Sequence, residues 1–353
     1  MSRLSPQVRI VVPCRNAGRT IAGCLDALAR STDLDAEIVV VDDGQNPPGA
    51  FPSPGDRLAI VRTAGGEGAG AARNAGARGF GGTVLVFVDA DVEVTRPDTL
   101  ATLVGPVLRK EADATVGTYA PSVGGGIFAR YKQYYLSYKY GNDREAIANT
   151  FWSALCAVDT GWFASLGGFP ECYRGAGPED IEFGIALTAS RGRILPVPGA
   201  QGYHLTRFTL WSLIRNDMRK GTEDIFVHWL RRIPLTDNRH VKGNDVAAVA
   251  AACSLPLALC VWSLAGPYPV ASCGLAYLFL RWKFLKDAFR GAGAALRVVA
   301  VPLTFILDIV RAAAVIAGST LAAGARLTGR PVPYVHRSRR RSHAVAPQLH
   351  GLS

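Results

Sequence analysis

The chain has 353 residues, 49% of them apolar, and a formal net charge of +11. This length suffices for one large α/β domain with an appendage. Its seven cysteines form no CxxC pair, which argues against a disulfide framework or a zinc site and fits a reducing compartment. The basic residues are not interleaved with aromatic ones on a single element, so we expect no nucleic-acid partner. Many of them flank apolar stretches near the C-terminus, which predicts membrane lipids as a partner instead.

Apolar runs of strand length alternate with helical patterns in the first 120 residues, and further strands follow. The expected strands are at residues 8–12, 37–41, 58–61, 83–94, 114–118, 149–159 and 193–197. The alternation predicts an α/β fold with a doubly wound, mostly parallel sheet.

The strand at residues 83–94 is the most informative of these. Its apolar run indicates burial on both faces, and the chain then leaves the sheet through Asp89 and Asp91. Both carboxylates can turn toward one point at the carboxyl edge of the sheet, where such sheets bind ligands. Two hard oxygen ligands on a short turn suit Mg²⁺ or Mn²⁺. The alternative is a polar turn that caps the next helix.

Two further polar elements are expected near the same edge. Asp42 and Asp43 follow the strand at 37–41 and can accept hydrogen bonds from a base or a ribose, or can merely begin a turn. Arg73 lies in a glycine-rich helix entry, where it either offers a cation to a nucleotide or pairs with a neighbouring carboxylate.

Candidate catalytic residues appear later in the chain. Glu179 and Asp180 stand in the first turn of an expected helix, after a glycine-rich loop, where a carboxylate can abstract a proton from a hydroxyl. Acidic residues also favour helix N-termini for electrostatic reasons alone. His204 follows another strand end and is either a third metal ligand or a structural histidine. Arg215 and Arg219 share a helix face, and could clamp a diphosphate or anionic headgroups.

Residues 8–230 resemble a family 2 glycosyltransferase with the GT-A fold, in which a Rossmann-like sheet binds a nucleotide-sugar. The resemblance rests on an ordered set of motifs: Pro13-Cys-Arg-Asn16, Asp42-Asp43-Gly44, Arg73-Asn74-Ala-Gly76, Asp89-Ala-Asp91, Leu166-Gly-Gly-Phe169 and Pro178-Glu179-Asp180. It implies an inverting transfer from a UDP- or GDP-sugar. Asp159 departs from the family, which often has a basic residue before the Gly-Gly-Phe element. The Gln-x-x-Arg-Trp signature of processive synthases is missing after His204, so we expect transfer of one sugar at a time.

The resemblance also implies roles for individual residues. It puts the donor nucleotide beside Pro13, Arg15, Asn16, Asp42, Asp43, Arg73 and Asp89. Asp89 and Asp91 would hold the Mg²⁺ or Mn²⁺ ion, with His204 as a further ligand in some members. Asp180, next to Glu179, would act as the general base.

Residues 246–280 contain no charged residue. A helix needs about 20 residues to cross a bilayer, so this stretch predicts a transmembrane hairpin with spans near 246–265 and 268–285. Basic residues lie on both sides of it, which places both flanks on the cytoplasmic side.

Residues 298–325 are apolar but carry Asp308 and Arg311, which favours an interfacial or re-entrant helix. The chain passes directly from its first residues into a strand, so we expect no secretory signal and a cytoplasmic catalytic domain. The predicted domains are a GT-A catalytic domain at 1–232, a transmembrane hairpin with basic flanks at 233–290, an apolar helix at 291–328 and a basic disordered tail at 329–353.

The expected protein is therefore a multi-pass hexosyltransferase of the inner or plasma membrane that serves the cell envelope. Its acceptor would be lipid-linked or a polysaccharide. An acceptor hydroxyl would need Asp180 as a base, whereas a polyprenyl phosphate is already ionised. The alternatives are a sugar nucleotidyltransferase, which residues 13–16 match poorly, and a catalytically silent membrane scaffold.

Overall fold

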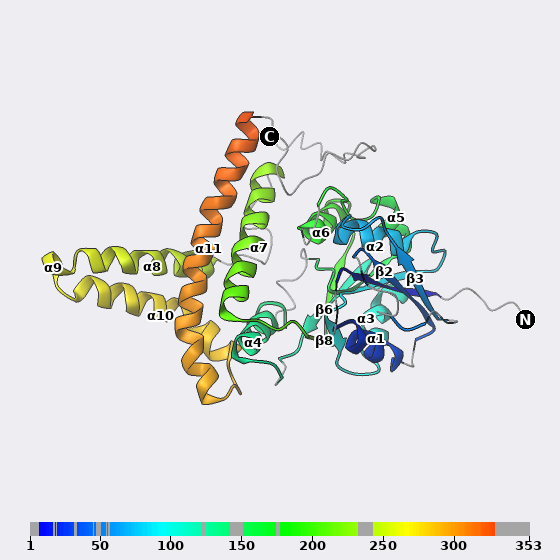
Figure 1. The fold of residues 1–353 in the computed structure, drawn as a ribbon, viewed down its shortest axis with the longest axis horizontal. Helices are drawn as coiled ribbons and strands as arrows, with labels where there is room; N and C mark the ends of the chain where they lie inside the picture. Colours follow the sequence, from blue (N-terminus) through cyan, green and yellow to red (C-terminus); the bar gives the residue numbers. More distant parts are fainter. Residues whose placement is uncertain are drawn as a thin grey trace, which may run out of the picture.

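The computed structural model describes residues 7–16, 18, 20–31, 34–44, 46, 51–53, 55, 57–121, 124–141, 151–173, 177–231 and 243–328. It contains an eight-stranded sheet covered by helices and, beside it, a group of longer helices that ends in a projecting hairpin (Figure 1). The predicted tail at 329–353 and the predicted boundary at residue 232 lie outside the described residues.

The sheet has the strand order β3-β2-β1-β4-β7-β6-β8-β5. Its strands are β1 (Val8–Cys14), β2 (Ala36–Asp42), β3 (Leu58–Arg62), β4 (Val84–Val88), β5 (Val92–Val94), β6 (Ala114–Tyr119), β7 (Leu155–Asp159) and β8 (Ile194–His204). The β3-β2-β1-β4 half is parallel, as is the pair β6 and β8, whereas β7 and β5 run antiparallel to their neighbours. The predicted α/β fold with a mostly parallel sheet is confirmed.

Helices cover both faces of this sheet. They are α1 (Thr20–Ala29), α2 (Ala69–Ala77), α3 (Thr99–Leu108), α5 (Thr160–Ser165) and α6 (Glu179–Ala189). The buried side chains of α1 and α3 join the strands in one apolar core. Those of α2, α5 and α6 form a second core on the other face, around the packed rings of Phe87, Phe163 and Phe183. Because both faces are covered, β4 is buried at every position.

The strand predicted at residues 83–94 is two strands in the structure. β4 ends at Val88, whereas β5 begins at Val92 and lies at the far edge of the sheet beside β8. The turn that contains Asp89 and Asp91 therefore carries the chain away from the centre of the sheet. Val92 pairs with His204 in the ladder between β5 and β8, so the strand register itself brings His204 beside Asp91.

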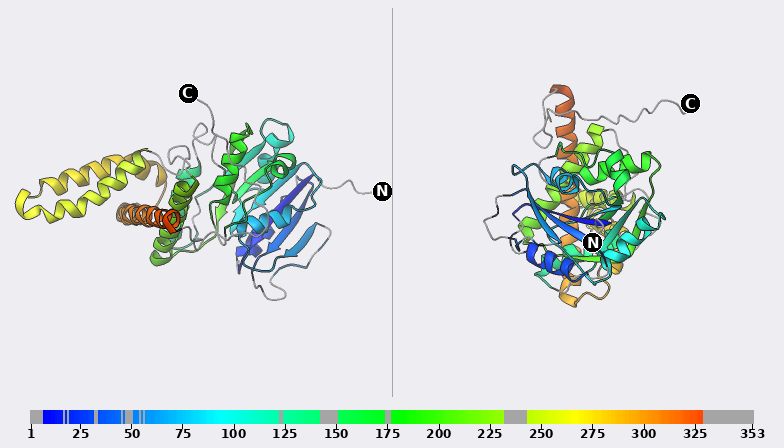
Figure 2. Two further views of the ribbon diagram at one scale, coloured as in Figure 1. Left: turned by 90° about the horizontal axis from the view of Figure 1, so that it is seen from above. Right: turned by 90° about the vertical axis from the view of Figure 1, so that its right-hand side faces the viewer.

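A second group of helices lies next to the sheet domain. It comprises α4 (Ile127–Gly141), α7 (Leu210–Arg231), α8 (Gly243–Cys260), α9 (Trp262–Ala265), α10 (Tyr268–Ala288) and α11 (Ala294–Thr328). α8 and α10 form the predicted hairpin and project away from the sheet (Figure 1). α11 lies along α7 and is seen nearly end-on in the view in which the hairpin lies lengthwise (Figure 2). Aromatic rings join α4 to α10 within this group, since Tyr138 packs on Phe284 with ring centroids 5.0 Å apart.

Among the described residues, one helix is both long and apolar enough to cross a membrane, and it is α11 rather than a hairpin helix. α11 is continuous over 35 residues, with no break of the kind that a re-entrant segment needs. The hairpin nevertheless exposes large apolar side chains along its length: Leu257, Leu264, Leu275, Phe279 and Trp282.

Candidate functional site

A cavity of about 1520 Å³ opens at the carboxyl ends of the central strands. Its wall includes most of the predicted site residues: Pro13, Arg15, Asn16, Asp43, Arg73, Asp89, Asp91, Glu179, Asp180, His204 and Arg219. Five carboxylates and one imidazole from distant parts of the chain thus face one space. Asp42 and Arg215 are the two predicted site residues that do not line it.

Asp91 and His204 form one end of this arrangement. The Nε2 atom of His204 lies 3.6 Å from Oδ2 of Asp91, and the same oxygen accepts a hydrogen bond of 2.6 Å from the Thr206 hydroxyl. Burial lowers the pKa of His204, although Asp91 opposes the shift. The imidazole is therefore neutral near pH 7, which is the form that ligates metals.

Arg73 occupies the centre of the site. Its side chain is 4% exposed and donates to Glu179 over 2.8 Å and to Asp89 over 2.7 Å. Burial disfavours its charge, but the two carboxylates outweigh burial and raise its pKa. Of the two interpretations of Arg73, pairing with carboxylates is the one the structure shows. Its contact with Asp89 also directs that carboxylate toward Arg73.

Glu179 and Asp180 begin α6, as the sequence predicted. Asp180 accepts hydrogen bonds from the backbone N–H of Ser153 over 3.1 Å and from its hydroxyl over 3.3 Å. Burial raises the pKa of Asp180, and it raises that of Glu179 to about 7, while Arg73 opposes both shifts. Carboxylates with raised pKa values accept protons more readily near neutral pH.

The acidic pair after β2 has largely structural contacts. Asp43 is buried and accepts hydrogen bonds from the Thr63 hydroxyl over 2.5 Å and from the backbone N–H of Gly68 over 2.9 Å. It thereby fixes the entry to α2 while still lining the cavity. Asp42 accepts from the side-chain amide of Asn46 over 2.6 Å and shapes a turn instead.

The structure separates the two arginines predicted on α7, because only Arg219 lines the cavity. Arg215 is exposed beside the ring of Trp211, outside the cavity, so the predicted clamp of Arg215 and Arg219 does not form there. Besides Arg219, Lys220 of α7 and Lys132 of α4 line the cavity. The four-residue spacing correctly predicted a shared helix face, but only the tertiary packing shows which face is turned inward.

Some of the side chains that line the cavity are suited to bind a divalent cation. Asp91 and His204 converge, and Nδ1 of His204 is buried with no hydrogen-bond partner among the described residues. Within that part of the chain, no three His, Cys, Asp or Glu side chains are close enough to hold an ion by themselves. Mg²⁺ and Mn²⁺ do not require this, because they are commonly bound through one or two carboxylates with water and substrate phosphates completing the shell.

Comparison with known proteins adds to this geometry. Residues 9–165, which carry β1 to β7 and the turn with Asp89 and Asp91, match the protein family described as Glycosyl transferase family 2. This segment belongs to that family.

Relatives of this family 2 segment are glycosyltransferases by name. Glycosyltransferase GlyG of Streptococcus pneumoniae is 28% identical over 121 residues, which are 33% of this chain and 40% of the relative. A PGL/p-HBAD biosynthesis glycosyltransferase of Mycobacterium bovis is 28% identical over 178 residues, which are 48% of this chain and 66% of the relative. The alignments thus span less than two thirds of either relative.

A solved structure resembles the chain over most of its length. The mannosyltransferase PcManGT from Pyrobaculum calidifontis, in complex with GDP-Man and Mn²⁺, superposes with a TM-score of 0.53. The superposition covers 93% of this chain and 89% of that one, at 20% sequence identity. The GT-A fold expected from the sequence is thereby confirmed for the sheet domain.

Proposed function

We propose that the protein is an inverting, metal-dependent glycosyltransferase. It moves one sugar from a nucleotide-sugar donor, a UDP- or GDP-sugar, to a lipid-linked or membrane-proximal acceptor. The observation that carries this proposal is the single cavity in which the carboxylates of several family motifs and His204 meet.

In this proposal the donor diphosphate lies near Asp91 and His204, which would hold Mg²⁺ or Mn²⁺. The bound ion would neutralise the charge that develops on the departing nucleoside diphosphate. Arg73 keeps Asp89 and Glu179 in place from a buried position between them. The complex of PcManGT with GDP-Man and Mn²⁺ supports a donor and an ion of these classes.

Asp180 is the proposed general base for an acceptor hydroxyl. Ser153 orients its carboxylate, and burial raises its pKa toward the range in which a base works. Asp180→Asn keeps the shape of this side chain, so we expect transfer to a hydroxyl acceptor to fall by roughly a hundredfold or more.

We further propose that α8 and α10 enter the membrane and that the sheet domain remains outside it, on the cytoplasmic side. α10 is uncharged from Tyr268 to Leu280, so at about 1.5 Å per residue roughly 20 Å of it is apolar, enough to enter the hydrocarbon core without crossing it. α11 runs in a different direction from the hairpin and would lie near the membrane surface (Figure 2).

The purified full chain tests the proposed activity. With Mn²⁺, a panel of UDP- and GDP-sugars and a membrane extract, we expect release of nucleoside diphosphate, and we expect Asp91→Ala to reduce it about a hundredfold. Asp98→Ala is the matched control, because Asp98 is exposed and pairs with Arg96 outside the cavity. Equal release by the Asp91 variant, or none with any donor, would overturn the proposal.

A further inference from the structure

His204 and Thr206 are neighbours on one side of the chain as it leaves β8. The ladder between β5 and β8 is continued by a hydrogen bond of 2.7 Å from the backbone N–H of Leu205 to the carbonyl oxygen of Asp91. Side chains of an extended segment point alternately to opposite sides. Leu205 is turned toward α1, where it lies 3.5 Å from the position that a Cβ on Gly23 would take. The imidazole and the Thr206 hydroxyl therefore share the other side, and both line the cavity.

Both side chains meet the same oxygen of Asp91. Its Oδ2 atom accepts a hydrogen bond of 2.6 Å from the Thr206 hydroxyl and lies 3.6 Å from Nε2 of His204. An O–H donor typically lies about 2.5–2.7 Å from an ionised acceptor oxygen, so this distance fits donation to the charged carboxylate. An aspartate side chain turns about two bonds, and fixing one of its oxygens selects one orientation. Thr206 thus sets the direction in which the remaining lone pairs of Asp91 point.

The imidazole of His204 is oriented by packing. The ring of Tyr119 meets it edge-on with centroids 5.6 Å apart, and the ring of Phe208 lies parallel to it at 6.3 Å. The side-chain amide of Gln133 donates to the backbone carbonyl of His204 over 2.9 Å. These contacts hold the imidazole, but none of them reaches Asp91. Within the part of the chain that the structure describes, the Thr206 hydroxyl is the one hydrogen-bond donor to the Asp91 carboxylate.

The two carboxylates of this turn are held in different ways. Asp89 pairs with Arg73 over 2.7 Å, and the guanidinium charge offsets the charge of that carboxylate. Thr206 is uncharged, so it orients Asp91 without neutralising it. Because attraction scales with the net charge that a cation meets, a carboxylate that is held by a hydroxyl attracts a divalent cation more strongly than one that is held by a guanidinium. Asp91 is therefore both directed and available.

We propose that Thr206 is a positioning residue for the divalent cation. Its hydroxyl holds Asp91 in place beside His204, so the carboxylate does not have to be ordered when the ion binds. Groups that hydrogen-bond to metal ligands commonly contribute about 10–100-fold to metal affinity. This inference rests on the proposed metal-dependent function, to which it adds a residue that acts through Asp91.

Binding of UDP and of GDP to the full chain in detergent tests this role. Titration calorimetry with Mn²⁺ and with EDTA gives the factor by which the ion tightens binding of the nucleotide that binds better. Thr206→Val removes the hydroxyl and keeps the shape of the side chain. We expect it to reduce this factor about tenfold and to leave the Kd in EDTA unchanged. Thr206→Ser keeps the hydroxyl and should retain the factor of the parent, which a purely structural role for the threonine would not require.

Thr95→Val is the matched control. The Thr95 hydroxyl also donates to β8, to the carbonyl of Gln201 over 3.2 Å, but it lies outside the cavity, so the Mn²⁺ factor should not change. Thr206→Ala is a second way to remove the hydroxyl if the valine variant does not fold, and thermal midpoints in EDTA show which variants are folded. Action through Asp91 makes a further prediction: in an Asp91→Ala background, adding Thr206→Val should change the Mn²⁺ factor no further.

Three results would overturn the positioning role alone. They are a full Mn²⁺ effect in folded Thr206→Val or Thr206→Ala, loss of the effect in Thr206→Ser to the same extent as in Thr206→Val, and a further loss when Thr206→Val is added to Asp91→Ala. Failure of the proposed function has a different signature. If Mn²⁺ does not tighten nucleotide binding by the parent, the proposed metal dependence and the role of Thr206 fail together.

Discussion

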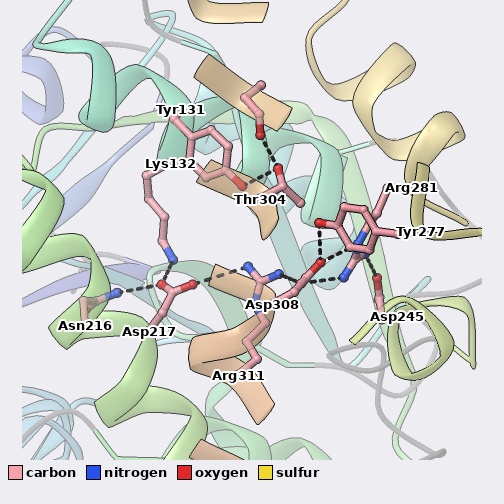
Figure 3. Close-up of polar contacts among 11 residues, drawn as sticks. Tyr131, Lys132, Asn216, Asp217, Asp245, Tyr277, Arg281, Thr304, Asp308 and Arg311 are labelled. Carbon is pink, nitrogen blue, oxygen red and sulfur yellow. Dashed lines mark hydrogen bonds and ion pairs between the residues drawn. The ribbon is translucent and has the colours of Figure 1, made fainter. Parts of the chain in front are cut away.

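Asp308 offers the sharpest test of how α10 and α11 are held together. It is fully buried and accepts hydrogen bonds from Tyr277 over 3.0 Å, from Arg281 over 2.7 and 2.9 Å, and from Arg311 over 2.7 Å. Three groups from α10 and α11 therefore converge on one carboxylate (Figure 3). Removing it leaves two guanidinium groups without their shared partner.

Breaking a buried ion pair by deleting one member costs about 3–5 kcal/mol. We expect Asp308→Ala to destabilise the packing of α10 on α11 by this amount. At about 2–4 °C per kcal/mol for a chain of this size class, the thermal midpoint in detergent should fall by at least about 6 °C. Limited proteolysis should cleave α10 or α11 before the sheet, because the two cores of the sheet domain are separate from this cluster.

Two comparisons make the test decisive. Asp98→Ala removes an exposed ion pair with Arg96 at 2.9 Å and should cost less than about 1 kcal/mol. The triple change Asp308→Leu, Arg281→Met and Arg311→Met replaces the charges by apolar groups and should recover most of the loss. The reasoning is refuted if Asp308→Ala is no more destabilising than Asp98→Ala.

Three further predictions concern pH, packing and the membrane. Burial raises the pKa of Glu179 to about 7 from 4.5, so the stabilising contribution of its protonated carboxyl is complete below about pH 4.5 and is lost as the pH rises through 7. Between pH 5.5 and pH 8, the free energy of unfolding of the parent should therefore fall by on the order of 1 kcal/mol relative to that of Glu179→Gln. A difference in thermal midpoints that does not change with pH would contradict this. A Cβ on Gly76 would lie 2.4 Å from Val11 and 2.8 Å from Val41, so Gly76→Ala should destabilise by about 1–3 kcal/mol in thermal unfolding, whereas Gly81→Ala, with open space around it, should have little effect. Leu275 and Phe279 are 69% and 81% exposed on the hairpin. Changing both to Asp should abolish flotation of the protein with lipid vesicles, because each charge opposes insertion by about 3 kcal/mol. Unchanged flotation would show that the hairpin is not the anchor.

Short-range sequence patterns correctly predicted the helices and strands whose positions depend on neighbouring residues. The strand of residues 8–12 and the acidic first turn of α6 appear where apolar runs and Pro178 placed them. The hairpin of α8 and α10 follows from an uncharged stretch interrupted by Gly266, whose φ is +64°. The break of the predicted 83–94 strand was missed, because both halves have the same apolar composition and nothing in the sequence says that they join different neighbours.

Contacts between distant segments could not be obtained in this way. The sequence left open whether Arg73 met a nucleotide or a carboxylate, and the answer depends on Glu179, which lies 106 residues further along. Lys132 and Asp217 were not recognised as partners, because α4 and α7 each present several charged positions. The helix face that meets the cavity is chosen by packing against other helices, which no local pattern records.

The sequence by itself determined the kinds of chemistry present, namely carboxylates at strand ends, an acidic helix start and a long uncharged segment. These features are local, because hydrophobic periodicity and turn residues act over a few positions. Only the tertiary structure decided which of them share a space. The ladder of β5 and β8 sets His204 beside Asp91, and the packing of α7 against α11 extends the same cavity toward the hairpin, because both arrangements depend on contacts between segments about a hundred residues apart.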